Sequence, residues 1–239
     1  MFGIREISKL PNGLGLDIPF NISRFKLFKD ENLEPIFSRN TDVNKTAFLN
    51  WRMAEGEDTL NMANLADGYF KSAISLLKMC LEDNDDKKAD IYIFPVMAIA
   101  NHGIELYLKT LIWIFNTLLQ IDRKIEGRHD LKQLYQTLTA KIQAYRRAIY
   151  LKEFKVESKV LKEYIEELSK VVGSTEKRDK MDFARYHLTN NYENHFYVEN
   201  TKNIELDLEN YLSKIQLIHT VFQGMYNQLI YVEMERDIY

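Results

Sequence analysis

The distribution of proline constrains the fold of this chain more than any other feature of its sequence. The four prolines are Pro11, Pro19, Pro35 and Pro95. Proline lacks a backbone N–H and breaks the interior of a helix, so the long segment that follows Pro95 is free to form continuous helices. We therefore expect an irregular N-terminal lobe over residues 1–52 and a helical domain over residues 53–239.

Apolar residues recur at helical spacing throughout the second of these regions. The predicted helices are 56–82, 90–120, a third that begins at Asp130 and continues to Ile149, 156–172 and 204–234. The second of them is apolar nearly all round, which is typical of a central buried helix. Asp130, three residues before Gln133, can cap the third helix. The expected fold class is all-α, a helical bundle.

Two segments carry a strand pattern instead. Leu14, Leu16, Ile18, Phe20 and Ile22 alternate with other residues in the N-terminal lobe. Pro19 lies within that run and predicts a short edge strand, because proline cannot donate to a sheet ladder. In the second segment, "FARYHL" and "HFYV" flank "TNNYEN", which predicts a small β-hairpin insertion over about residues 181–199, before the last helix.

The composition is that of a globular protein, with 46% hydrophobic and 28% charged residues. The net charge is −3, so RNA binding would require a local basic patch. The single cysteine, Cys80, excludes a disulfide framework and suits a reducing compartment. The N-terminal decapeptide lacks a long apolar run, and apolar stretches such as 110–121 are shorter than a membrane helix requires. These features predict a cytoplasmic protein without a membrane span.

A polar stripe lies within the apolar second helix. His102, Glu105 and Lys109 are spaced three and four residues apart, so they share one helix face. Glu105 and Lys109 can form an ion pair that supports a crowded helix, and His102 can be a satisfied buried histidine. Alternatively, the stripe faces a pocket or a subunit interface and binds a ligand or a partner. His129 directly precedes Asp130 at the next helix start, where capping is a sufficient reason for the motif.

Arg185 and His187 in "FARYHL" form a second candidate site. Metal-independent RNA cleavage needs a base for the 2′-hydroxyl proton and a cation for the phosphorane charge, which suit histidine and arginine. Unpaired bases could stack on neighbouring aromatic side chains; the candidates are Tyr186, Tyr192 and Phe196, with Tyr197 beside them. The alternative is a hairpin that packs its aromatics on the helical body, with Arg185 bridging carboxylates. His102 and His129 are reserve catalytic candidates.

A metal site is not expected. His102–Glu105 and Glu126–His129 are each three residues apart, as in di-iron carboxylate bundles. The first pair has the reverse order of the Glu-x-x-His motif, and the second falls in a predicted turn. The sequence also lacks a glycine-rich phosphate loop and a Ser-His-Asp motif. We therefore predict neither a metal nor a cofactor.

The segments "HGIELYLKTLI", "GRHDLKQLYQTL" and "FARYH" resemble the HEPN superfamily of α-helical domains. The match rests on the Glu105-x-x-x-Lys109 helix and on the Gly-x-His-Asp-Leu turn, Gly127 to Leu131, that starts the next helix. It covers roughly residues 56–234. The resemblance implies a HEPN-like bundle that acts on RNA in a defence, stress or toxin–antitoxin system. It also implies a homodimer, with RNA and a cognate partner protein, such as a nucleotidyltransferase antitoxin, as partners.

Many members of that family are metal-independent endoribonucleases with an Arg-x4–6-His motif on a late helix. Here Arg123 and His129 alone have this spacing, and they fall in a predicted turn. Arg185 lies too close to His187, and too far from His195, to match. Two hypotheses therefore remain open: a metal-independent endoribonuclease, and a non-catalytic interaction or scaffold module that binds a partner protein or a nucleotide.

Overall fold

The structure, a computed structural model, describes residues 34–122, 129–145, 148–172, 182–189, 191–199 and 203–234. The chain divides into two compact units, Met1–Phe48 and Leu49–Tyr239. In the first unit the short 3-10 helix η2 (Val43–Lys45) begins after Asp42, whose side chain accepts a hydrogen bond from the Asn44 backbone N–H. The predicted edge strand around Pro19 lies outside the described residues.

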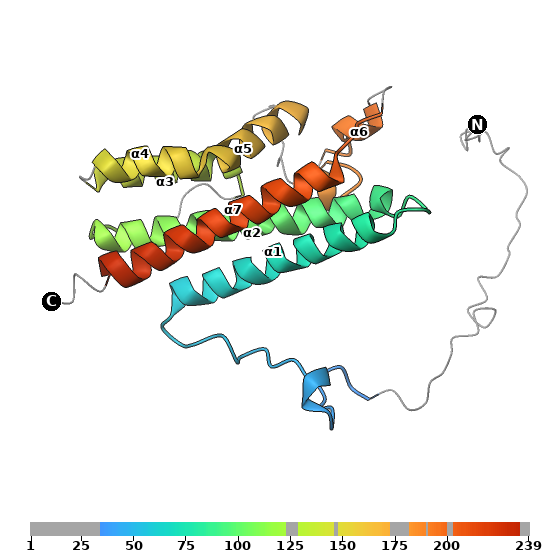
Figure 1. Cartoon of the computed structure of the whole chain (residues 1–239), viewed down its shortest axis with the longest axis horizontal. Coiled ribbons are helices and arrows are strands. Elements are labelled where there is room, and N and C mark those ends of the chain that lie inside the picture. The colour runs from blue at the N-terminus through green and yellow to red at the C-terminus, as the bar shows by residue number, and fades with distance from the viewer. Residues whose placement is uncertain are drawn as a thin grey trace, which may run out of the picture. The chain divides into compact units, whose positions relative to one another are not determined.

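The second unit is a bundle of α-helices (Figure 1). They are α1 (Asp58–Glu82), α2 (Ala89–Leu118), α3 (Leu131–Ala144), α4 (Ala148–Glu157), α5 (Lys159–Val172), α6 (Phe196–Glu199) and α7 (Leu208–Gln228). A 3-10 turn, η3 (Asp182–Ala184), precedes α6, and one turn of π-helix, η4 (Leu229–Met234), extends α7. The described residues contain no strand, so the all-α class is confirmed.

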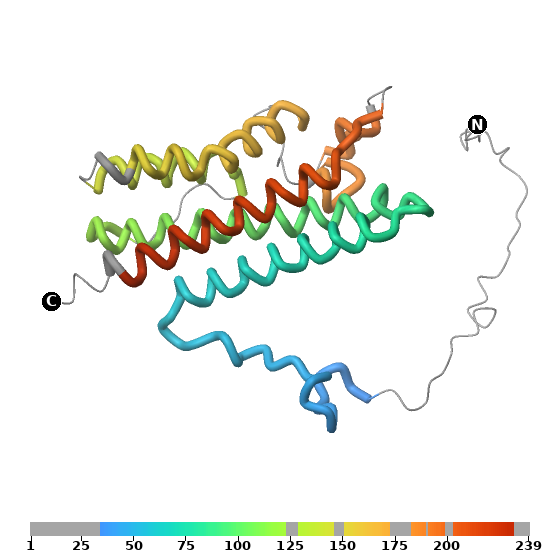
Figure 2. The backbone as a smooth tube through the Cα atoms, in the orientation of Figure 1, coloured from blue at the N-terminus to red at the C-terminus, as the bar shows by residue number. Residues whose placement is uncertain are grey.

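The long helices α1, α2 and α7 lie side by side, and α3, α4 and α5 form a second group against α2 and α7 (Figure 2). The rings of Phe70, Tyr107 and Phe222, one from each long helix, are fully or almost fully buried where they meet. Tyr107 and Phe222 stack with their ring centroids 5.0 Å apart. Aromatic rings bury large apolar areas, so this cluster fixes the packing of the three helices.

Gly103 allows α1 and α2 to approach each other closely. A Cβ atom at this position would lie 3.0 Å from Cδ2 of the buried Phe70 ring. The absence of a side chain at Gly103 therefore makes room for the central aromatic cluster.

The predicted third and fourth helices differ from the observed ones. The third was expected to continue to Ile149, but α3 ends at Ala144 and a separate α4 follows. Ser158 separates α4 from α5; its buried hydroxyl donates to the Phe154 carbonyl at 2.5 Å and lies 3.0 Å from the Tyr135 hydroxyl. The sequence did not reveal the end of α3, because Tyr145 and Ile149 continue its apolar spacing beyond Ala144.

The predicted β-hairpin is not confirmed. Between residues 182 and 199, the described residues form η3, a single antiparallel bridge between Leu188 and Asn194, and the short helix α6. Aromatic packing organises this segment: Phe183 is buried and meets Phe196 edge to face, with ring centroids 5.4 Å apart. The alternating aromatic residues that suggested strands include Phe183 and Phe196, which pack against each other from a 3-10 turn and a short helix.

By length and composition alone, α2 is apolar enough to cross a membrane, the one helix among the described residues that meets this criterion. The prediction from sequence required an uncharged run, whereas α2 qualifies when up to two charged residues are allowed. The core helix of a soluble protein passes the same test, and α2 packs against α1, α3 and α7.

Candidate functional site

The buried carboxylate of Glu105 on α2 is the centre of a cluster of basic side chains. Lys109 Nζ donates to Glu105 Oε1 at 2.6 Å, and His129 Nδ1 lies 2.9 Å from the same oxygen. His102 Nδ1 lies 3.6 Å from the other oxygen, Oε2. The predicted polar stripe therefore forms one continuous network, and it recruits His129 from outside α2.

Local sequence explains how these residues meet. Three and four residues separate Glu105 from His102 and Lys109, which places all three on one face of α2. His129 contacts the same carboxylate from outside α2, because it directly precedes Asp130, the residue that caps α3. There the Asp130 side chain accepts a hydrogen bond from the Gln133 backbone N–H, as predicted, and fixes where α3 begins.

The environment of Glu105 keeps its carboxylate ionised. Burial raises the pKa of this group, but the hydrogen bonds from His102, Lys109 and His129 outweigh burial and lower the pKa to about 2. Glu105 is therefore an unsuitable proton donor or acceptor near neutral pH. Its role is to hold and orient the basic groups around it.

The histidines of the cluster are accessible although the carboxylate is not. The His102 and His129 side chains are 41% and 52% exposed, whereas that of Glu105 is 6% exposed. Each histidine turns Nδ1 toward Glu105, so Nε2 is the ring nitrogen on the far side from the carboxylate. One carboxylate therefore contacts both imidazoles, although His129 lines a separate small pocket with residues of α3 and α5.

A pocket of about 220 Å³ opens beside the cluster and brings in the second candidate site. It is lined by Tyr69, Ala98, Ile99, His102, Glu105 and Arg185. Tyr69 meets His102 edge to face, with ring centroids 4.6 Å apart. Arg185, far away in sequence, follows η3 and also lies over the ring of Tyr186, with its guanidinium carbon 5.9 Å from the ring centroid. The structure therefore unites Arg185 with the α2 stripe.

The other residues of the second candidate site lie elsewhere. His187 is exposed and does not line the pocket. The aromatic candidates differ: Tyr186 is 59% and Tyr192 86% exposed, whereas Phe196 is half-buried against Phe183. Tyr186 and Tyr192 thus remain accessible for stacking, whereas Phe196 belongs to the packing of its own segment.

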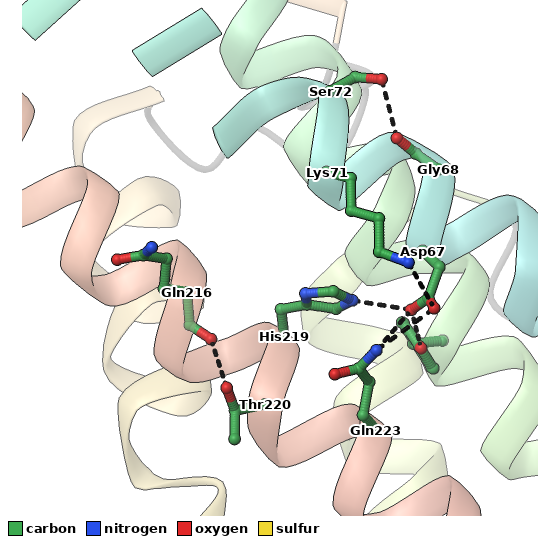
Figure 3. A network of polar contacts seen from close by, with 9 residues as sticks. Asp67, Gly68, Lys71, Ser72, Gln216, His219, Thr220 and Gln223 are labelled. Atoms are coloured by element: carbon green, nitrogen blue, oxygen red, sulfur yellow. Dashed lines mark hydrogen bonds and ion pairs between the residues drawn. The ribbon is translucent and has the colours of Figure 1, made fainter. Parts of the chain in front are cut away.

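A second polar cluster was not foreseen from the sequence (Figure 3). Asp67 on α1 accepts a hydrogen bond from the Tyr107 hydroxyl on α2, and its Oδ1 lies 2.7 Å from His219 Nε2 on α7. Gln223 donates to both carboxylate oxygens at 3.3 Å, and Lys71 to one of them at 3.4 Å. One carboxylate therefore links the three long helices.

The Asp67 cluster is built for stability. The His219 ring is buried and stacks on Phe70 at 4.7 Å between centroids. Burial raises the pKa of Asp67, but hydrogen bonds from Tyr107 and His219 outweigh it and lower that pKa below its ordinary value. The available signal in the sequence was His219 itself, a polar residue within the apolar stripe of the last predicted helix.

Among the described residues, no three histidine, cysteine, aspartate or glutamate side chains are grouped in a way that could hold a metal ion. Two residues of the alternatives considered above lie outside the described residues: Glu126 of the metal alternative and Arg123 of the Arg-x4–6-His spacing.

No protein-family model, curated protein or solved structure matches the chain. The geometry of the Glu105 cluster is therefore the main indication of what the protein does.

Proposed function

We propose that this chain is a HEPN-like, RNA-directed protein of a defence or stress system, and that it cleaves RNA without a metal ion at the Glu105 pocket. The observation that carries the proposal is a single buried carboxylate that orients two accessible histidines and a lysine beside a pocket lined by Arg185. The proposal includes a cytoplasmic homodimer and a cognate partner protein, such as a nucleotidyltransferase antitoxin.

The charge of this cluster favours a phosphodiester. Lys109 and Arg185 each carry a positive charge, and Glu105 carries a negative one. The net charge of these three groups is therefore about +1. A local positive charge of this kind supports RNA binding by a chain whose net charge is −3.

The chemistry follows from the two imidazoles. One, in its neutral form, takes the proton of the ribose 2′-hydroxyl, which attacks the adjacent phosphorus. The other, in its protonated form, gives a proton to the leaving 5′-oxygen. Lys109 and Arg185 stabilise the negative charge that develops on the phosphoryl oxygens. The products are a 2′,3′-cyclic phosphate and a 5′-hydroxyl, with no metal required.

This proposal changes the roles that the sequence suggested. Arg185 keeps its role in charge stabilisation, because it lines the pocket with His102. The acid–base role passes from His187 to His102 and His129, the reserve candidates. His187 then serves as a control, since it is an exposed histidine close to Arg185 in sequence that neither lines the pocket nor, unlike His129, pairs with Glu105 among the described residues.

The second candidate function is a non-catalytic interaction module. One observation favours it: three basic side chains of this chain already satisfy the Glu105 carboxylate, as in a structural ion cluster. Under this alternative, the exposed side chains of the cluster, His102 and His129, bind a partner protein or a nucleotide, and the protein does not cleave RNA.

The decisive experiment is incubation of purified protein with a mixed RNA pool in the presence of EDTA. The wild-type chain is compared with His102→Asn, His129→Asn, Arg185→Ala and the control His187→Ala. We expect cleavage by the wild type and by the His187 variant, and a loss of at least about 100-fold in each of the two other histidine variants. Intact RNA with the wild type and with every variant would favour the interaction module.

A further inference from the structure

A larger pocket, distinct from the Glu105 site, lies between α7 and the helices α3 and α4. Its volume is about 580 Å³, and the second half of α2 contributes to its wall through Leu111 and Phe115. Pockets of this size, about 300–1,000 Å³, typically hold small organic ligands. None of the residues in the proposed RNA site lines this one.

The wall of this pocket is mainly apolar. Representative lining side chains from the four helices are Phe115, Leu138, Ile142, Phe154, Val221 and Met225. Several belong to the core, since Leu138 is fully buried and Phe115, Ile142 and Phe154 are almost fully buried. The body of a ligand in this pocket would therefore be a hydrocarbon or an aromatic group.

Two carboxylates give the pocket its charge. Glu153 and Glu157 both line it, and because they are four residues apart they lie on the same face of α4. Within the described part of the chain, neither forms an ion pair. Lys152 and Lys155 occupy other faces of the same helix and are not part of the lining. Among the described residues that line the pocket, the charged ones are therefore negative; both are exposed, so this charge lies at the mouth of the pocket and complements a cation there.

Gly224 leaves the α7 side of the pocket open. It lines the pocket, and a Cβ atom built on it would meet no atom within 4 Å. Packing within the bundle therefore does not require glycine here, although glycine in the middle of a helix costs about 0.5–1 kcal/mol relative to alanine. Gly224 is exposed, so it lies at the rim of the pocket, where a larger side chain would narrow the entrance.

We propose that this pocket binds a small molecule with an apolar body and a single cationic end, such as an alkylammonium. The apolar body lies among the side chains of α2, α3 and α7, and the ammonium group lies beside Glu153 and Glu157. Because both glutamates are exposed, the ammonium group pairs with them at the mouth of the pocket and keeps part of its contact with water. This binding activity is independent of RNA cleavage.

Calorimetric titration of the full chain tests the proposal with two probes that share a ten-carbon chain, decyltrimethylammonium and decyl sulfate, both below their micelle concentrations. We expect the cationic probe to bind wild-type protein at least 10-fold more tightly than the anionic one. The double substitution Glu153→Gln and Glu157→Gln should abolish that preference. Equal affinity of the wild type for both probes would overturn the proposal.

A matched pair of glycine variants tests whether the probe binds in this pocket. Gly224→Leu adds a large side chain at the rim of the pocket and should weaken binding of decyltrimethylammonium at least 10-fold. Gly68→Leu is the control: Gly68 is an exposed α1 residue whose added Cβ also meets nothing within 4 Å, and it lies outside the pocket. Helix content from circular dichroism establishes that both variants fold. Unchanged binding in folded Gly224→Leu would contradict the proposal. Failure of the wild-type protein to bind either probe would also contradict it.

Discussion

At the scale of single residues, two carboxylates determine the chemistry of the bundle. Glu105 gathers side chains that reach the surface, whereas Asp67 gathers groups that link the helices internally. The first cluster was partly predictable, because helical spacing places His102, Glu105 and Lys109 together. The recruitment of His129 was not predictable, because helical spacing does not relate residues 24 positions apart that meet only in the folded chain.

The low pKa of Glu105 predicts a stability that depends on pH. In the unfolded chain this carboxyl takes up a proton near its ordinary value of 4.5, whereas in the folded chain it does so at about 2. Its stabilising contribution, up to about 3 kcal/mol, is therefore complete above pH 4.5 and is lost as the pH falls toward 2. Urea unfolding of the wild type and of Glu105→Gln should show a difference that shrinks over this interval. Parallel curves between pH 5 and pH 2 would contradict this role.

Removal of the Asp67 carboxylate should affect stability and leave RNA chemistry unchanged. Asp67→Asn deprives the buried His219 and Tyr107 of a charged partner, so the free energy of unfolding should fall by about 1–3 kcal/mol. Urea denaturation measures this change, and Glu82→Gln, at the exposed end of the same helix, should change it by less than about 0.5 kcal/mol. A large loss of RNA cleavage in a folded Asp67→Asn protein would show that the two clusters are coupled.

At the scale of elements, helices with continuous apolar periodicity were predicted well. The long helices α1 and α2 begin and end within two residues of the predicted bounds. One error falls where a helix ends without a change in hydrophobic spacing: α3 stops at Ala144, although apolar residues continue at helical spacing to Ile149. Another falls where aromatic packing resembles strand alternation, as around Phe183.

The cap of α3 provides a test of how an element positions the site. Asp130→Ala should lower the free energy of unfolding by about 1 kcal/mol, because the first turn of α3 loses its side-chain acceptor. The same change should weaken RNA cleavage, since His129 adjoins the cap. Asp130→Ser preserves an acceptor and should retain most of both properties. Equal effects of the alanine and serine substitutions on both properties would indicate that capping does not position His129.

Two glycines on helices should respond to alanine in opposite directions. Gly103→Ala places a Cβ 3.0 Å from the buried Phe70 ring and should destabilise the protein by about 1–3 kcal/mol. Gly224→Ala meets no neighbour and should stabilise it by about 0.5–1 kcal/mol through helix propensity. Thermal unfolding followed by circular dichroism measures both changes. The same sign for both variants would contradict the packing described for α1 and α2.

At the scale of the whole molecule, the absence of proline after Pro95 and the helical periodicity were sufficient to predict an all-α fold. The candidate site was predicted as two separate groups of residues, one on α2 and one around Arg185. The fold brings Arg185 beside His102 and leaves His187 outside the pocket. The positions of Arg185 and His187 follow from the 3-10 turn η3 that precedes them, whereas the sequence suggested an extended strand there.

The most direct test of the central proposal uses one synthetic RNA and the same RNA with 2′-deoxyribose at its main cleavage position, both incubated with wild-type protein and EDTA. If His102 and His129 catalyse attack by the 2′-hydroxyl, the first RNA is cut to a 2′,3′-cyclic phosphate and a 5′-hydroxyl end. The second RNA then remains intact at that position. Cleavage of the deoxy-substituted position, or products with a 5′-phosphate, would contradict the proposed mechanism.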